Sequence, residues 1–224
     1  MTLCLPAPPT IPAGTAFAFC DHEDADPDAV PPDLHGAARR RRLDHAAGRR
    51  AAADALRVLT GRAAPVPRAD SGAPVWPAGI SGAISHAQGR AVAIVGWSAH
   101  HAGLGIDLES VTRRPQDLAR VTLAPHERAQ LGPQPDATTI TLSFSAKESL
   151  FKALYPSVQE HFGFDAAEII RLDRQGGVLR LCRALPPWGE GSEFPFHWTI
   201  WRGQVLTLLA ATHVQARSVA PPST

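Results

Sequence analysis

Two acidic side chains stand two residues apart near the middle of the chain. Asp107 and Glu109 lie in a segment, 103–111, that we predict to be a strand. Alternate residues of a strand point to the same face, so both carboxylates would leave one face together. Mg²⁺ usually takes one or two carboxylates and completes its shell with water and substrate phosphate. The pair predicts a magnesium site; an ordinary edge strand with solvated acids is the alternative.

A third acid lies further along the chain. Glu148 and Lys152 are four residues apart, so on a helix they share one face. A surface ion pair is one interpretation of this spacing. Apolar neighbours favour a buried helix instead: Leu142, Phe144, Leu150, Phe151 and Leu154. A buried helix with one carboxylate and one ammonium indicates half of a metal–phosphate site, with Glu148 as a third metal ligand and Lys152 on a phosphate.

Basic residues gather upstream of these acids. Arg42, His45 and Arg49 are spaced to line one helical face. The arginine run at 39–42 is also typical of a solvated face or a nucleic-acid patch. The pair Ser85-His86 is by itself typical of a turn, because no acid is evident that would complete a hydrolytic triad.

The elements that must position these residues follow from local pattern. We predict loops over 1–36 and 62–83, and a helix over 37–60 that closes at Gly61. A helix is expected over 126–131, and another over 145–154 that Pro156 stops. The predicted strands are 91–97, 103–111, 168–172, 177–182, 196–201 and 204–211. This order indicates an α+β fold rather than a regular β-α-β alternation.

Bulk properties narrow the class of protein. The chain has 224 residues, is 44% hydrophobic and carries a net charge of +1. Such a balance provides a core but no overall field for nucleic acid or an anionic membrane. Three scattered cysteines argue against a disulfide framework or a structural zinc site. We expect a cytoplasmic protein without a signal peptide or membrane span.

Two segments carry a specific resemblance. Residues 105–109 (GIDLE) and 144–152 (FSAKESLFK) resemble the two signature motifs of the 4′-phosphopantetheinyl transferase superfamily, G-I/V-D-x-E and F-S/C-x-K-E-S/A-x-x-K. Both match at every defined position and stand in the family's order. The stretch 41–49 (RRLDHAAGR) is similar to R-R/K-x-E-x-x-x-G-R in the enterobactin-synthetase-type branch, with Asp44 in place of the usual Glu. The resemblance spans about residues 41–211.

The resemblance implies roles for the remaining residues. In the family, a segment similar to 81–86 contacts the phosphates of coenzyme A, which points to Ser85 and His86. Arg49 and then Arg42 would hold the nucleotide end. Many relatives have a Lys where this chain has Ala73, and Arg68 would compensate. Asp107, Glu109 and Glu148 would hold Mg²⁺, and Glu148 and Lys152 would be catalytic. Lys152 would neutralise charge on the diphosphate, and Lys147 would either assist it in binding coenzyme A or only face solvent.

The resemblance also implies an architecture. The family fold is a pseudo-twofold pair of similar α/β subdomains with the active site in the cleft between them. On that pattern the halves would be about 1–103 and 104–224, within one transferase domain. A monomer is expected.

The implied reaction moves 4′-phosphopantetheine from coenzyme A to a serine of an apo acyl or peptidyl carrier protein. The serine hydroxyl attacks the β-phosphate and 3′,5′-ADP leaves, so positioning and electrostatic stabilisation are the main needs. Glu148, or a metal-bound water that it orients, is the expected base, with Glu127 as a weaker candidate. Residues 112–141 are the expected docking region for the carrier, and the branch indicates siderophore or nonribosomal peptide synthesis.

Two other classes of function use the same residues. Another Mg²⁺-dependent enzyme acting on a diphosphate, such as a nucleotide hydrolase or nucleotidyltransferase, would need the same acids and lysine. No G-x-x-x-x-G-K-S/T loop is present, which excludes the commonest such competitor. A non-catalytic coenzyme A-binding module is the second alternative, but all three acids are retained. A nucleic-acid binder is disfavoured by the near-neutral charge.

Overall fold

The computed structural model describes residues 10–131, 134–174 and 176–213. The strands are β1 (Thr15–Asp21), β2 (Ile80–Ala87), β3 (Arg90–Trp97), β4 (Gly103–Glu109), β5 (Ala167–Leu172), β6 (Gly176–Leu181), β7 (Glu193–Trp201) and β8 (Gln204–Ala211). The α-helices are α1 (Arg39–Thr60), α2 (Pro115–Thr122), α3 (Pro125–Gln130) and α4 (Ala137–Val158). Three short 3-10 helices are η1 (His22–Asp24), η2 (Pro32–Leu34) and η3 (Phe164–Ala166).

The strands form two antiparallel sheets. The first has the order β1-β3-β2 and the second the order β4-β8-β7-β6-β5. In both sheets the first strand along the chain pairs with the last, and a helix of 22 residues, α1 or α4, lies between them in sequence. The α+β class predicted from the sequence is confirmed, and the shared topology is what two similar halves would show.

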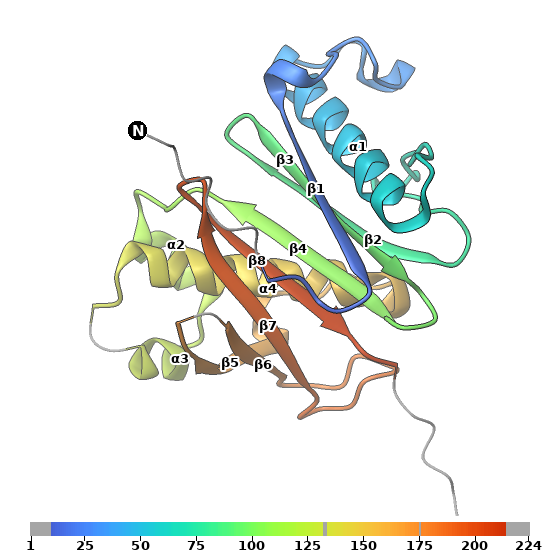
Figure 1. Cartoon of the computed structure of the whole chain (residues 1–224). Coiled ribbons are helices and arrows are strands. Elements are labelled where there is room, and N and C mark those ends of the chain that lie inside the picture. The colour runs from blue at the N-terminus through green and yellow to red at the C-terminus, as the bar shows by residue number, and fades with distance from the viewer. Residues whose placement is uncertain (1–9, 132–133, 175, 214–224) are drawn as a thin grey trace, which may run out of the picture.

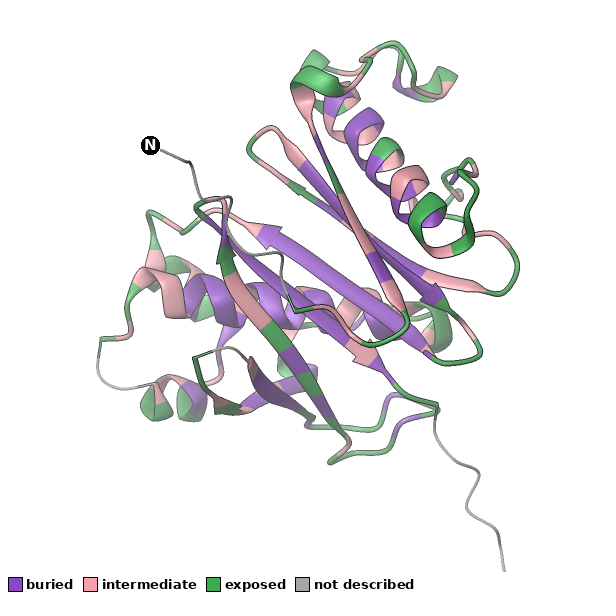
Figure 2. Ribbon diagram, viewed as in Figure 1, coloured by how far each residue is buried: buried purple, intermediate pink, exposed green. Residues whose placement is uncertain are grey.

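The two halves stack in layers, with α1 and α4 on the outside and the sheets between them (Figure 1). One apolar cluster joins α1 to the first sheet, and a second joins α4 to the larger sheet. A third cluster lies where the sheets face each other, with Val92 and Ile94 of β3 packed among Leu104, Ile106 and Leu108 of β4. Strand β4 and much of α4 are consequently buried (Figure 2).

Two glycines bring α4 unusually close to β4. A Cβ at Gly103 would lie 1.8 Å from the carbonyl oxygen of Ala153, and one at Gly105 would lie 1.9 Å from that of Ser149. Any other side chain would therefore push the helix away from the strand. This contact fixes the distance between the acids of β4 and the motif residues of α4.

The ends of the long helices follow local rules. Helix α1 ends at Gly61, which has φ +77° and donates its N–H to the Arg57 carbonyl. Helix α4 begins after Asp136, whose side chain accepts the Thr139 N–H at 2.9 Å. None of the helices in the described part of the chain combines the length and apolar character needed to cross a membrane.

Several predicted boundaries were wrong. Strand β1 and the first half of β2 fall in stretches predicted as loops, and α2 was missed. Helix α4 begins eight residues before the predicted start at Ser145 and continues past Pro156 to Val158. Proline lacks an N–H, so it removes one bond of the last turn without ending the helix there. The loop predicted for residues 1–9 lies outside the described residues.

Candidate active site at the junction of the two halves

The structure joins the two sequence motifs directly. Lys152 of α4 donates from Nζ to Asp107 Oδ1 at 2.6 Å and to the Ile106 carbonyl at 3.1 Å. Ser85 of β2 donates from Oγ to the same Asp107 oxygen at 2.9 Å. Asp107 is only 2% exposed. One buried carboxylate is thus shared by a side chain from each half of the protein.

The acids around this contact carry an excess of negative charge. Asp107 Oδ2 is buried and has no hydrogen-bond partner among the described residues. Burial, and then the charges of Asp107 and Glu148, raise the pKa of Glu109 to about 7, against the opposing effect of Lys152. Burial also raises the pKa of Glu148, an effect that Lys152 opposes and Asp107 reinforces. The three carboxylates are therefore close enough for their charges to interact.

These features fit a divalent cation. The orphaned Asp107 oxygen and the raised pKa of Glu109 are what an additional positive charge would relieve. No three His, Cys, Asp or Glu side chains in the described ranges are already arranged to hold a metal ion. Mg²⁺ needs few protein ligands, because water and substrate phosphates fill most of its shell. The metal roles of Asp107, Glu109 and Glu148 stay a prediction.

A basic cavity of about 350 Å³ lies beside α1. It is lined by Leu34, Arg41, Asp44, His45, Gly48, Arg49, Arg68, Gly72, Pro74, Ile84 and His86. The structure thus brings together Arg49, Arg68 and His86 from three separate segments, as the sequence analysis expected. Gly48 leaves room for Ile84, since a Cβ there would lie 3.0 Å from Ile84 Cγ2.

The charges in this cavity favour an anion. Arg49 Nε is buried without a hydrogen-bond partner in the part of the chain that the structure describes. Burial and the neighbouring Arg68 lower the pKa of Arg49. Burial, followed by Arg49 and Arg68, lowers the pKa of His45. The positive charges of Arg49 and Arg68 repel each other and oppose protonation of His45. A phosphate placed between these side chains would stabilise their charged forms.

Arg42 is not among the residues that line this cavity, and its role at the nucleotide end of coenzyme A stays a prediction. Its Nη1 instead pairs with Asp28 Oδ1 at 2.8 Å. Arg41 takes its place, because residues 41, 45 and 49 recur every four positions and so stay on one face of a helix. The spacings 41, 45, 49 and 42, 45, 49 both follow one face of a helix, so the sequence alone did not distinguish Arg41 from Arg42.

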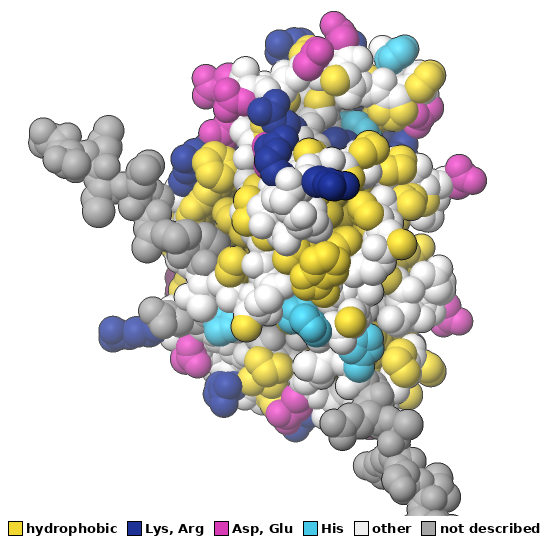
Figure 3. Space-filling view, turned by 45° about the vertical axis from the view of Figure 1, so that its right-hand side comes forward, with side chains coloured by type: hydrophobic (Ala, Val, Ile, Leu, Met, Phe, Trp, Pro, Cys, Tyr) yellow, Lys and Arg dark blue, Asp and Glu magenta, His cyan; other side chains and the backbone are white. Residues whose placement is uncertain are grey.

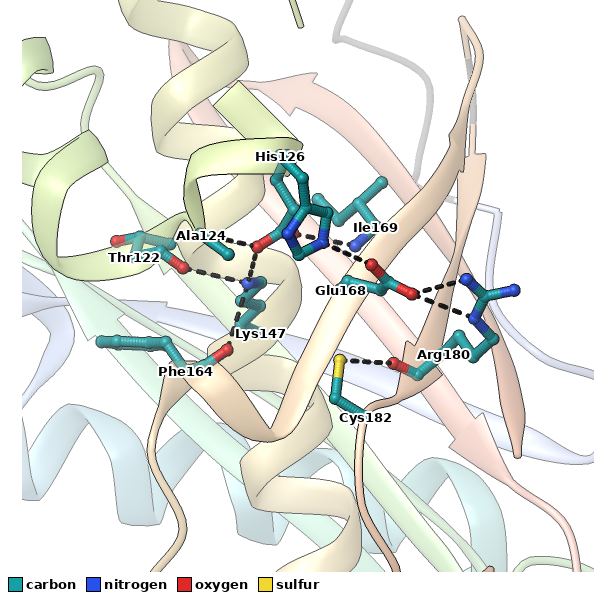
Figure 4. A network of polar contacts seen from close by, with 10 residues as sticks. Thr122, Ala124, His126, Lys147, Phe164, Glu168, Ile169, Arg180 and Cys182 are labelled. Atoms are coloured by element: carbon teal, nitrogen blue, oxygen red, sulfur yellow. Dashed lines mark hydrogen bonds and ion pairs between the residues drawn. The ribbon is translucent and has the colours of Figure 1, made fainter. Parts of the chain in front are cut away.

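Lys147 is also placed differently from the prediction that it reaches coenzyme A. It is 4% exposed, and its Nζ donates to Glu127 Oε2 at 2.7 Å, to the Thr122 carbonyl at 2.9 Å and to the Phe164 carbonyl at 3.1 Å (Figure 4). All three donors of its ammonium are used within the protein. Lys147 therefore holds α3 and η3 against α4.

The same contact excludes Glu127 as a base. Glu127 is 2% exposed, and its second oxygen, Oε1, accepts the Ile169 N–H at 2.9 Å. Its Oε2 accepts the Ala124 N–H at 3.0 Å in addition to Lys147. With both of its oxygens accepting hydrogen bonds inside the protein, this carboxylate holds the surrounding segments together and presents no free oxygen to a substrate.

A larger cavity of about 630 Å³ is lined by residues of both halves. They are Ala69, Ser71, Ala73, Pro74, Trp76, Gly82, Ala83, Ile84, Phe151, Lys152, Tyr155, Pro156, Gln159 and His161. It shares Pro74 and Ile84 with the basic cavity. Figure 3, which turns the right-hand side of Figure 1 forward, shows Lys and Arg side chains gathered beside an area of hydrophobic ones.

Sequence reasoning did not single out the apolar lining of this larger cavity. Trp76 sits beside Gly82, where a Cβ would lie 2.8 Å from the Trp76 ring. Phe151 and His161 also line a third cavity of about 250 Å³, together with Glu148. The motif residue Glu148 lines this third cavity and Lys152 lines the larger one, and both cavities have Phe151 and His161 in their walls.

Most of the chain matches known proteins. Residues 31–96 match the 4'-phosphopantetheinyl transferase N-terminal domain, and residues 103–212 match the 4'-phosphopantetheinyl transferase superfamily. Enterobactin synthase component D of Escherichia coli (strain K12) is 35% identical over 179 residues, covering 78% of this chain and 80% of the relative. The protein of that name from Salmonella typhi is 34% identical over 182 residues, covering 80% and 75%.

A further relative matches a shorter stretch of the chain. 4'-Phosphopantetheinyl transferase Svp of Streptomyces mobaraensis is 35% identical over 147 residues, covering 62% of this chain and 59% of that protein. The matched regions contain Asp107, Glu109, Glu148 and Lys152 within one superfamily match. The chain belongs to the 4′-phosphopantetheinyl transferase superfamily, in the branch of the enterobactin synthase component D proteins.

Proposed function

We propose that this enzyme transfers the 4′-phosphopantetheine group from coenzyme A to a serine of an apo acyl or peptidyl carrier protein, with Mg²⁺ and with release of 3′,5′-ADP. The observation that carries the proposal is the contact between Lys152 and Asp107. It puts one cation and the acids of both motifs beside cavities that are lined by basic and apolar residues. This combination suits a ligand with a diphosphate, a further phosphate and an uncharged arm.

Coenzyme A would place its phosphorylated nucleotide end in the basic cavity. Arg49 is our first candidate for its phosphate, since its Nε is buried and unpartnered among the described residues. Arg68 lines the same cavity and is held at 2.9 Å by Asp33. This position supports the proposal that Arg68 compensates for Ala73, which stands where many relatives have a Lys. Ser85 is the less direct candidate, because its hydroxyl is engaged with Asp107.

The residues Asp107, Glu109 and Glu148 would hold Mg²⁺. Once bound, the ion would supply Lewis acidity toward the diphosphate oxygens. Lys152 already lies on Asp107 and would neutralise charge that develops on the diphosphate. Its side chain is 24% exposed and lines the larger cavity, which supports a contact with a bound ligand.

Glu148 is the proposed base. The serine oxygen bonds to the β-phosphorus, the bond from that phosphorus to the bridging oxygen breaks, and 3′,5′-ADP leaves with the bridging oxygen. Glu148, or a water that it orients, accepts the serine proton.

The carrier protein and its pathway are proposed from the branch of the family. The relatives are named for enterobactin synthase, so we propose a carrier in siderophore or nonribosomal peptide synthesis. The docking region is proposed within 112–141, apart from 132–133, which the structure does not describe. We also propose one monomeric domain with halves that meet near residue 103. Cys182 is exposed and unpaired, which suits the reducing cytoplasm.

The release of 3′,5′-ADP separates this function from its alternative. The protein is incubated with coenzyme A and Mg²⁺, with and without an apo carrier, and the nucleotide products are separated chromatographically. We expect 3′,5′-ADP only when the carrier is present. A nucleotide hydrolase or nucleotidyltransferase would release product without it, and that result would contradict the proposal.

A further inference from the structure

One acid stands among the cations of the basic cavity. Asp44 of α1 lines this cavity together with His45, Arg49, Arg68 and His86. Its side chain is only 14% exposed. A carboxylate in a cavity that is to bind phosphate weakens that binding by charge alone. Its presence therefore needs a separate reason.

Asp44 uses one oxygen to contact two histidines. His22 Nε2 lies 2.9 Å from Asp44 Oδ1, and His86 Nδ1 lies 3.6 Å from the same oxygen. An ionised carboxylate can only accept, so the His22 nitrogen is the donor. The side chains of His22 and Asp44 are mostly buried, whereas that of His86 is 52% exposed. The arrangement leads from a buried pair outward to His86.

The backbone fixes this arrangement from the other side. The His22 N–H donates to the Gly89 carbonyl at 2.8 Å. Gly89 belongs to the two-residue turn that follows β2, the strand that carries His86. His22 is thus tied both to the strand hairpin of His86 and to Asp44 on α1. It lies before residue 31, where the family match begins.

We propose that Asp44 and His22 are positioning residues that hold the His86 ring in the orientation in which its other nitrogen, Nε2, meets a phosphate of the ligand. The inference rests on the proposed function, because the phosphate is that of coenzyme A. The Asp44 carboxylate turns Nδ1 toward α1 and so leaves Nε2 for the cavity. His22 fixes the carboxylate, in the way that outer hydrogen bonds orient histidines that bind ligands.

Two explanations of Asp44, an effect of its charge alone and an effect on the orientation of His86, predict opposite changes in phosphate affinity for Asp44→Asn. Removing a negative charge from a basic cavity would strengthen phosphate binding if only the net charge mattered. If Asp44 orients His86, the same change weakens binding, although the cavity becomes more positive. The sign of the change in affinity therefore distinguishes the two.

The experiment measures 3′,5′-ADP binding by calorimetry, and KM for coenzyme A and kcat at saturating carrier. For Asp44→Asn we expect KM for coenzyme A and the dissociation constant of 3′,5′-ADP to rise about tenfold. This is the expected effect of losing one charge-assisted hydrogen bond, the one between His86 and the phosphate. His22→Phe keeps a ring of similar size and should raise both about threefold. In both variants kcat should stay within about twofold, since the lost contact is made equally before and during the reaction.

A double-mutant cycle tests whether Asp44 acts through His86. In a His86→Ala background, Asp44→Asn should add no further loss of affinity. The matched control is Asp54→Asn, which removes a carboxylate from the same helix where it pairs with Arg50 and Arg57. This control should leave KM and binding unchanged.

Three results would overturn the inference. They are tighter or unchanged binding in Asp44→Asn, a loss that persists in the His86→Ala background, and wild-type protein that does not bind 3′,5′-ADP. Wild-type protein that binds 3′,5′-ADP with the expected pattern in the variants, yet modifies no carrier, would contradict the proposed function and leave this inference standing.

Discussion

Lys152 Nζ lies 2.6 Å from Asp107 Oδ1, which joins the helix of the second motif to the strand of the first. The contact has a second consequence. The other oxygen of Asp107 is buried and has no hydrogen-bond partner among the described residues. The ammonium of Lys152 therefore satisfies only one of the two carboxylate oxygens. The close packing of α4 on β4 through Gly103 and Gly105 makes this geometry possible.

Replacing Lys152 should expose this imbalance. In Lys152→Met, Asp107 loses its cationic partner while staying buried, so the metal-free protein should lose about 2 kcal/mol of stability. Added Mg²⁺ should then raise the melting temperature of the variant more than that of the wild type, because the ion binds an uncompensated site. Calorimetric melts with and without Mg²⁺ provide the measurement. An equal response of both proteins would argue against a metal at Asp107.

The close approach at Gly105 is testable by one methyl group. Gly105→Ala would put a Cβ 1.9 Å from the Ser149 carbonyl oxygen, so we expect a loss of about 3 kcal/mol and strongly reduced transfer. Gly189→Ala is the matched control, since a Cβ there meets nothing within 4 Å. Urea unfolding compares the two. If Gly105→Ala were as stable as the control, the packing of α4 on β4 would be wrong.

The raised pKa of Glu109 predicts a pH-dependent cost to the metal-free fold. Below pH 4.5 this carboxyl is protonated in both folded and unfolded states. Between pH 4.5 and about 7 the folded state keeps a proton that the unfolded state releases. The free energy of unfolding therefore falls as the pH rises from 4.5 to about 7.

Glu109→Gln removes this pH-dependent loss of stability and should abolish transfer of phosphopantetheine. In the presence of a chelator, its melting temperature should exceed that of the wild type at pH 8 and equal it near pH 4.5. Mg²⁺ should stabilise the wild type more at pH 8 than at pH 6, because the ion competes with the proton. A difference between the two proteins that stays constant with pH would contradict the assigned cause.

The buried pair of Lys147 and Glu127 should matter for stability rather than for coenzyme A. Lys147→Met leaves Glu127 buried without its cation and should cost about 3–5 kcal/mol. The double variant Lys147→Met/Glu127→Leu should recover part of this loss. In the folded double variant, KM for coenzyme A should stay within about twofold of the wild type. A large rise in KM would show that Lys147 does reach the ligand.

Local signals explain what could be predicted from the sequence. The two motifs predicted that Asp107 and Lys152 belong to one site, although not that they contact each other directly, and Gly61 predicted the end of α1. Strands β1 and β2 were missed because small residues occupy one face of each, which weakens the apolar alternation of a strand. In addition, β1 pairs with β3, which lies far along the chain, so no local signal indicates that pairing. The turn at Gln88 and Gly89, both with positive φ, was the unused signal for the β2–β3 hairpin.

Arg42 and Lys147 make contacts within the protein that their motifs did not indicate, and the cause is geometric. Lys147 is adjacent to Glu148 in sequence, but successive residues of a helix point about 100° apart, so the two side chains face different neighbours. Arg42 differs from Arg41 by the same rotation. Neither could be placed without knowing which side of its helix packs against the sheet.

The central claim is that this site attaches phosphopantetheine to a carrier serine, and the most direct measurement is the intact mass of that carrier. After incubation with coenzyme A, Mg²⁺ and the wild-type protein, the carrier should gain one phosphopantetheine group. A carrier with its acceptor serine replaced by alanine should gain nothing, and folded Glu148→Gln protein should be slower by at least about 10²-fold. An unchanged carrier mass across siderophore, polyketide and fatty-acid carriers, or full activity in Glu148→Gln, would contradict the account.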